Sequence, residues 1–238
     1  MERLRFWRWG RDDEEDDEEV DDDGPVAPEP VRTVGPLVRE GRLVRLRRHV
    51  PDNRVAFQRW YADDEIAHLL RHDQRPLNER QSRGYFDTFI LPLSARGECF
   101  AIHEREDDRL IGTTALTDFV NRRGRRSAMF RIVIGEKERW SRGFGTEATI
   151  LVMAEGFGPL DLDEIRLEVF RHNPRAIRAY ERVGFRVDGE HVEHVEHVGR
   201  ERRELHVIEM VLPHAVFEQL HPDYAVSGPD DRRWSGRS

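Results

Sequence analysis

The chain of 238 residues is 37% hydrophobic and 36% charged, enough for one domain with a core and a well-solvated surface. No apolar run is long enough to span a bilayer, and the first ten residues contain no hydrophobic signal region. We therefore expect a cytoplasmic protein without a membrane partner. The one cysteine, Cys99, excludes an intramolecular disulfide and a cysteine metal site, and we expect it to be a buried strand residue.

The net charge of −8 is unevenly distributed along the chain. Residues 12–23 contain eleven acidic side chains and no basic one, and without them the formal charge changes from −8 to +3. Eleven like charges repel one another and cannot bury apolar surface, so we expect residues 1–36 to be a disordered acidic extension. The mildly basic remainder suits an anionic ligand.

The pattern after the extension predicts one domain over residues 37–215, followed by a polar C-terminal tail over 216–238. Alternating apolar residues predict a strand at 43–46, and helical spacing predicts helices at 53–70 and 78–90. Three consecutive strands are then expected, joined by turns at 107–108 and 121–124, and they cover residues 100–102, 110–119 and 129–134.

The second half of the domain alternates helices with strands. Its predicted elements are a helix at 145–157, a strand at 165–170, a helix at 174–183 and strands at 185–190 and 204–212. Antiparallel strands followed by strand–helix–strand units predict an α/β fold in which helices cover a mixed sheet.

The first motif that suggests a chemical function is Trp140-Ser-Arg-Gly-Phe-Gly-Thr-Glu-Ala148, at the start of a predicted helix. Gly143 and Gly145 allow the backbone to approach an anion and direct its N–H groups toward it. The positive end of the helix dipole and Arg142 add to the attraction, which favours phosphate binding. Turns also need glycine for purely structural reasons, so this motif alone is weak evidence.

The second group is Asn173-Pro-Arg-Ala-Ile-Arg-Ala-Tyr180-Glu-Arg-Val-Gly-Phe185. Asn173 suits a helix N-cap, Pro174 the first helical position and Gly184 the left-handed residue after the helix. These structural roles leave Tyr180 unexplained, because its hydroxyl needs a polar partner or solvent. Taken alone, Tyr180 is either a core tyrosine or a functional one.

Together, the two motifs in this order resemble the GNAT superfamily of N-acetyltransferases, in particular its RimJ/RimL-like branch, and are also similar to spermidine acetyltransferases. The resemblance covers residues 37–215 and implies the GNAT fold, a mostly antiparallel twisted sheet flanked by helices. It also implies an acyltransferase that uses acetyl-CoA as co-substrate and has no metal. Ser141 departs from the glycine that is common at its position in the branch.

The resemblance assigns roles to particular residues. The backbone amides of Ser141, Arg142, Gly143, Phe144, Gly145 and Thr146 are expected to hold the pyrophosphate of CoA. The strand residues Ile132, Val133 and Ile134 are expected to pair with pantetheine through their backbone, and an N–H of this strand to stabilise the oxyanion. Asn173 is expected near the thiol arm, and Tyr180 is expected to be the general acid that protonates the leaving thiolate.

The base that deprotonates the acceptor amine is not evident. Met129 stands where related enzymes often have a glutamate, and Glu104, Asp118 and His103 are the substitutes near strand ends. An α-amino group with a pKa of about 7.7–8.0 can react without a strong base, which favours a protein or peptide N-terminus as acceptor. The alternatives are a polyamine, an aminoglycoside-like amine, or a regulatory module that binds CoA without catalysis. A homodimer is compatible with the sequence.

Two other clusters are conspicuous. The repeat Glu190-His-Val-Glu-His-Val-Glu-His-Val198 contains His191, His194 and His197, but residues three apart on a strand point to opposite faces, which argues against metal binding by the three together. We expect a solvated hairpin on the substrate side. The second cluster consists of four arginines in a predicted turn, Arg122, Arg123, Arg125 and Arg126. No aromatic residues for base stacking accompany them, so we expect a solvated turn and no nucleic-acid partner.

Overall fold

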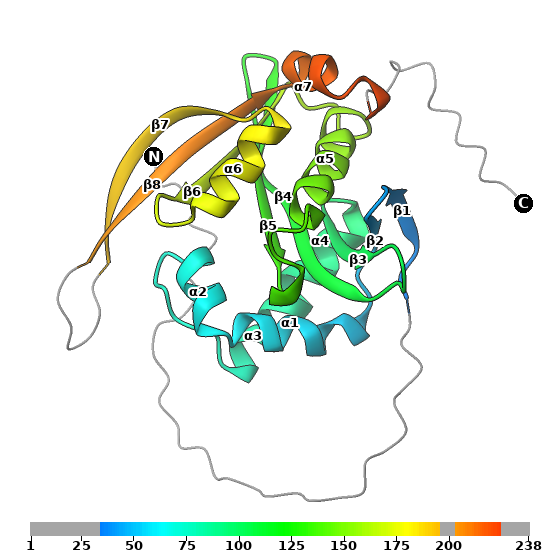
Figure 1. The fold of residues 1–238 in the computed structure, drawn as a ribbon, viewed down its shortest axis with the longest axis vertical. Helices are drawn as coiled ribbons and strands as arrows, with labels where there is room; N and C mark the ends of the chain where they lie inside the picture. Colours follow the sequence, from blue (N-terminus) through cyan, green and yellow to red (C-terminus); the bar gives the residue numbers. More distant parts are fainter. Residues whose placement is uncertain (1–33, 196–202, 225–238) are drawn as a thin grey trace, which may run out of the picture.

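The computed structural model describes residues 34–195 and 203–224. The acidic segment, the end of the histidine repeat and most of the predicted C-terminal tail lie outside the described residues. Within them, eight strands form one sheet in the order β1–β2–β3–β4–β5–β6–β8–β7 (Figure 1). Neighbouring strands are antiparallel except for the parallel pair β5 and β6. The predicted α/β fold with a mostly antiparallel sheet is confirmed.

Seven of the strands in the described residues overlap those expected from apolar alternation, and β1 was not expected. Their bounds are β1 Leu37–Glu40, β2 Val44–Arg47, β3 Cys99–Glu104, β4 Leu110–Arg122, β5 Arg125–Ile134, β6 Glu164–Phe170, β7 Arg186–Val195 and β8 Arg203–Pro213. Strand β7 contains the first part of the histidine repeat and lies at one edge of the sheet.

The N-terminal helices pack on one face of the sheet and are more broken than the sequence suggests. They are α1 (Arg54–Tyr61), α2 (Asp64–Leu70), α3 (Glu79–Tyr85) and α4 (Leu91–Arg96). The predicted helix at 53–70 is interrupted because the Asp63 carboxylate accepts the N–H of Ile66 (3.0 Å) and starts α2 as an N-cap. After α3, a π-helical turn leads directly into α4, which ends at the left-handed Gly97. None of the helices in the described ranges has the length and apolarity needed to cross a membrane.

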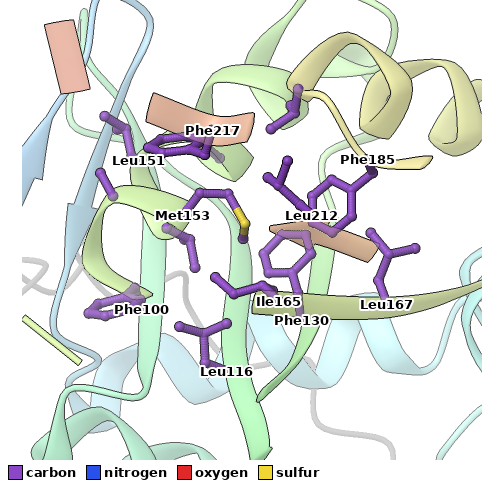
Figure 2. Close-up of a cluster of buried hydrophobic side chains, with 14 of the residues drawn as sticks. Phe100, Leu116, Phe130, Leu151, Met153, Ile165, Leu167, Phe185, Leu212 and Phe217 are labelled. Carbon is purple, nitrogen blue, oxygen red and sulfur yellow. The ribbon is translucent and has the colours of Figure 1, made fainter. Parts of the chain in front are cut away.

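The other face is covered by α5 (Phe144–Phe157), α6 (Pro174–Val183) and α7 (His214–Leu220). Figure 2 shows Leu151 and Met153 of α5 among apolar side chains of the sheet, with Phe217 of α7 close to them. Phe217 is only 1% exposed, so α7 is part of the packed domain. The domain boundary predicted at residue 215 falls inside α7, whereas the packing of Phe217 extends the folded domain through this helix.

Strands β5 and β6 separate part of the way along their length. They are paired from Ser127 opposite Glu164 to Met129 opposite Arg166, and no pairing continues beyond that rung. Farther on, β5 remains paired with β4 and β6 with β8, so the sheet opens between its two halves. The opening leaves backbone groups of β5 without a strand partner on that side and provides the space for the site described below.

Candidate active site

A cavity of about 320 Å³ lies where β5 and β6 separate, bounded by the beginning of α5 and by α6. Most of the residues expected to contact the cofactor line it. They are Ile132, Val133, Ile134, Ser141, Gly143, Gly145, Thr146 and Asn173, together with the predicted acid Tyr180. The structure thus brings both sequence motifs to one cavity. Arg142 and Phe144 are not among the lining residues: Arg142 is exposed and the ring of Phe144 is buried in the core.

The beginning of α5 suits an anion. Helix N-termini leave their first amides without partners inside the helix, and no side chain caps this one. The chain enters the helix through two left-handed residues, Ser141 (φ 59°) and Gly143 (φ 89°). A fourteen-residue helix adds its dipole to these uncapped amides, so this end of the cavity fits the pyrophosphate of CoA.

Basic side chains surround the same end of the cavity. Arg175 at the start of α6 lies over the ring of Trp140, with 3.6 Å between the guanidinium carbon and the ring centroid. The Trp140 ring is fixed in turn, because its indole N–H donates to the Ile134 carbonyl (2.6 Å). Arg178 and Arg182 of α6 also line the cavity. The sequence motif had pointed to Arg142, whereas the arginines that line the cavity include three of α6.

The first turn of α5 is anchored by a buried carboxylate that the sequence did not single out. Glu147 is 8% exposed, and it accepts backbone N–H groups of Arg42 (2.9 Å), Leu43 (2.6 Å) and Val44 (2.9 Å). These hydrogen bonds join the turn between β1 and β2 to α5. They hold the anion-binding end of the helix in a fixed position against the sheet.

The backbone of β5 presents alternate residues to the opening. The Gly135 N–H donates to the carbonyl of Ile111 in β4 (2.9 Å), so the backbone of Gly135 faces β4, and by alternation the backbone of Val133 faces β4 as well. Ile132 and Ile134 turn their backbone toward the opening, where the Ile134 carbonyl is engaged by Trp140. Val133 is thus a correction to the predicted set, because its backbone is directed to β4 rather than to the opening. Ile132 is the residue that offers backbone groups there.

Tyr180 projects from α6 into the cavity, and its ring makes edge contacts with Phe130 (6.2 Å between centroids) and Phe185 (6.0 Å). Burial raises the pKa of the Tyr180 phenol well above its usual range. The hydroxyl is therefore protonated at neutral pH, which is the state that a general acid requires.

Asn173 lines the cavity and also caps α6. Its side-chain oxygen accepts the Ala176 N–H (3.2 Å), and Pro174 follows at the first helical position. What Asn173 can still offer a ligand is its amide NH₂ group. Both the structural and the functional interpretation of this residue are therefore compatible with its geometry.

The three substitutes considered for the missing base lie elsewhere. Glu104 pairs with Arg139 (2.7 Å) and Asp118 with Arg131 (3.1 Å). His103 is buried, with Nδ1 2.6 Å from the Asp108 carbonyl, and burial lowers its pKa. None of the three lines the cavity. As candidate bases, they are disfavoured by position and by existing partners.

Glu168 on β6 is a carboxylate that lines the cavity, and sequence reasoning missed it. It lies on the strand that leaves β5, opposite Glu209 of β8, and His72 Nε2 is 3.9 Å from its carboxylate. The signal in the sequence was the alternation Ile165-Arg-Leu-Glu-Val-Phe170. This pattern predicts that Glu168 and Phe170 share a face, but not that this face borders the cofactor site.

Comparisons with known proteins agree with this geometry. The model of the acetyltransferase (GNAT) domain matches residues 43–186, more than half of the chain. The uncharacterized N-acetyltransferase YoaA of Bacillus subtilis is 26% identical over 155 residues, 65% of this chain and 85% of YoaA. Spermidine N(1)-acetyltransferase of Escherichia coli is 40% identical over 65 residues, 27% of this chain and 34% of that enzyme.

Solved structures show the same fold. The spermidine N-acetyltransferase from Vibrio cholerae, in complex with CoA and spermine, superposes with a TM-score of 0.60 at 22% identity, over 74% of this chain and 99% of that chain. A GNAT-family acetyltransferase from Bacillus anthracis superposes with a TM-score of 0.58 at 14% identity, over 73% and 96%. Enzymes of this family transfer an acyl group from acetyl-CoA. The chain therefore belongs to the GNAT acetyltransferase family and is an acyltransferase.

Proposed function

We propose that this enzyme transfers the acetyl group of acetyl-CoA to a primary amine of a small polycation, with Glu168 as the base. The observation that carries the proposal is the carboxylate of Glu168 in a cavity whose other end is basic. Two further carboxylates, Glu209 and Glu193, adjoin it on β8 and β7. Acidic groups beside the reaction site favour an acceptor with more than one positive charge. The similarity to spermidine acetyltransferases supports the same acceptor class.

Binding of the co-substrate follows from the two ends of the cavity. The amides at the start of α5 and the arginines of α6 are suited to the phosphates, and the Ile132 backbone to the pantetheine arm. Bound acetyl-CoA supplies an activated thioester at the opening of the sheet. The Ile132 N–H is the donor that can stabilise the negative charge on the carbonyl oxygen during attack.

Proton transfer on the acceptor side is assigned to Glu168. A primary ammonium with a pKa near 10 is neutral in only about one molecule in a thousand at pH 7, so a proton must leave before attack. The Glu168 carboxylate can accept this proton directly or through one water molecule. His72, at 3.9 Å from Glu168 and 2.5 Å from Glu193, links the two carboxylates.

Proton transfer on the thiol side is assigned to Tyr180. Its phenol lines the cavity and remains protonated at neutral pH because burial raises its pKa. It can therefore donate a proton to the departing sulfur while Glu168 removes one from the nitrogen. The two groups lie on different elements, α6 and β6, so each can act on its own side of the reacting carbonyl.

The experiment follows thiol release from acetyl-CoA against spermidine, a monoamine and a peptide with a free N-terminus. We expect turnover with spermidine, and a loss of about 10²-fold in kcat for Glu168→Gln at pH 7. The loss should shrink as the pH approaches 10, because more of the amine is then already neutral. Glu190→Gln, on the same hairpin as Glu193 and paired with Arg171 at the surface, is the matched control.

The outcome distinguishes the acceptor classes. A peptide N-terminus, which the sequence favoured, remains a prediction. If the peptide is turned over faster than spermidine, the acceptor is a peptide N-terminus and not a polycation. Full activity of Glu168→Gln with every acceptor would remove this residue from the mechanism. Tight binding of acetyl-CoA without turnover on any acceptor would contradict the proposed acceptor class as a whole.

A further inference from the structure

Three side chains of the types that coordinate metal ions meet on one face of β6, β8 and β7. Glu168, His191 and Glu209 each offer one nitrogen or oxygen atom, and these atoms all lie within 4.8 Å of one another. The three strands are adjacent, with Glu168 directly opposite Glu209 and His191 paired with Val207, two residues from Glu209. Strand pairing thus holds the three Cα positions in place.

The direct pairing of Glu168 with Glu209 is unfavourable by itself. Like charges on directly opposed residues of neighbouring strands destabilise a sheet. The side chain of a third carboxylate, Glu193, is 14% exposed, and its Oε1 lies 3.4 Å from Nε2 of His191. Carboxylates around one imidazole are a set of groups that a metal ion can bind, and the geometry of the imidazole indicates which kind.

His191 is oriented as a metal-ligating histidine would be. Its Nδ1 is buried and has no hydrogen-bond partner within the part of the chain that the structure describes. The nearest carboxylate oxygen, Oε1 of Glu209, is 3.0 Å away but outside hydrogen-bond geometry. Its Nε2 faces Glu193 Oε1 instead. Metal-bound histidines typically donate their second ring N–H to a carboxylate, which fixes the tautomer that leaves the other nitrogen free to ligate.

We propose that Glu168, His191 Nδ1 and Glu209 form a binding site for a divalent first-row metal ion, with Zn²⁺ as the best match. One imidazole and two carboxylates are a donor set that Zn²⁺ accepts, and three protein ligands leave a fourth position for water. Tetrahedral coordination at about 2.0–2.1 Å separates ligand atoms by roughly 3.4 Å. The three atoms already lie within 4.8 Å of one another, close to this separation.

The site has a consequence for the enzyme, and this consequence rests on the proposed function. Glu168 belongs both to the metal site and to the cavity that takes the acceptor. A carboxylate that coordinates a metal ion cannot accept a proton from the amine. Bound Zn²⁺ therefore inhibits acetyl transfer by occupying the base.

The histidines of the repeat do not share one face of β7 in its described part, as expected for a strand. His194 is on the other face of β7, 61% exposed and 4.0 Å from Glu204. The proposed ligands instead combine one histidine of the repeat with glutamates of two other strands. No spacing in the sequence shows this combination, because residues 168, 191 and 209 meet only through strand pairing.

The test is a calorimetric titration of the full chain with Zn²⁺ in a buffer that does not bind metal, before any activity is measured. Co²⁺ absorption in the visible range provides an independent signature of tetrahedral coordination. We expect one site in the wild type and in His194→Gln, and at least a tenfold loss of affinity in His191→Gln. Equal affinity in His191→Gln and wild type, or no Zn²⁺ binding by the wild type, would overturn the proposal.

An activity measurement then tests the consequence. With a chelator present, His191→Gln and His194→Gln should match the wild type, since neither residue belongs to the proposed acetyl-transfer machinery. Added Zn²⁺ should inhibit the wild type and His194→Gln but spare His191→Gln. Equal inhibition of all three would show that Zn²⁺ acts elsewhere and overturn the inhibitory role. Absence of turnover in every variant would reject the proposed function alone, since the titration reads the metal site without it.

Discussion

At the scale of single residues, a substitution at Tyr180 tests its proposed role as the general acid. Tyr180→Phe removes the hydroxyl and keeps the ring that packs on Phe130 and Phe185. We expect kcat to fall by about 10²-fold, with no change in the affinity for acetyl-CoA. Thiol release and calorimetry measure the two quantities separately. Tyr224→Phe, a tyrosine that does not line the cavity, should leave both unchanged.

The pH dependence provides a second measure of the same residue. A group with a raised pKa keeps its proton up to a higher pH, so the acid form of Tyr180 should persist beyond the usual titration of tyrosine near pH 10. The wild-type kcat profile should therefore show no loss of activity on the alkaline side below about pH 10. A decline centred between pH 8 and 9 would indicate a different acid.

Residues differ in how far sequence alone could identify them. The position of Tyr180 at the cavity was predictable, because the capping pattern explains its neighbours and leaves the phenol without a structural role. Glu168 was not, because alternation along a strand shows which residues share a face and not what the face borders. Val133 shows a related limit: the motif marks the strand, but which backbone groups face the opening depends on the register with β4.

At the scale of elements, α5 depends on a contact with the turn between β1 and β2. Glu147→Gln removes the charge that receives three backbone N–H groups and replaces one acceptor oxygen by a donor. We expect the free energy of unfolding to fall by about 2–3 kcal/mol, since buried hydrogen bonds to a charged group are strong and their loss leaves amides unsatisfied. Urea denaturation measures the change.

The control is a glutamate in an exposed pair. Glu79→Gln breaks a surface contact with Arg83 one helical turn away, which should cost about 0.5 kcal/mol or less. Equal effects of the two substitutions would contradict the anchoring role of Glu147. In addition, Glu147→Gln should weaken acetyl-CoA binding, because the start of α5 would no longer be held in position.

Elements were predictable where local periodicity decides them. The strands β3, β4 and β5 and the helices α5 and α6 follow apolar spacing and their caps, and they lie where expected. The region before β3 was harder, because helical spacing continues through Asp63 even though its side chain ends one helix and starts the next. Such a break depends on one N-cap side chain, and the spacing of apolar residues does not predict it.

At the scale of the whole molecule, the opening between β5 and β6 determines where the candidate active site lies. The core that contains α5 and α7 includes side chains from both halves of the sheet, so the halves stay joined while β5 and β6 diverge. The cofactor motifs come from the loop before α5 and from α6, and the acidic groups come from β6, β7 and β8. The divergence places the motifs and Glu168 of β6 around one cavity, and the acidic group of β8 adjoins Glu168. Local sequence patterns cannot predict it, because it results from where pairing stops.

The extent of the folded domain gives the last prediction. The ring of Phe217 packs at a tilt against the ring of Phe157 (5.3 Å between centroids) and is 1% exposed, although we expected this residue in the C-terminal tail. If α7 is part of the core, Phe217→Ala should lower the free energy of unfolding by about 3–5 kcal/mol, as truncation of a buried aromatic does. Leu220→Ala in the same helix, at a side chain that is 54% exposed, is the matched control and should cost less than about 1 kcal/mol. Equal, small effects in urea denaturation would return α7 to the tail, whereas a large difference between the two variants means that the cooperative unit includes α7.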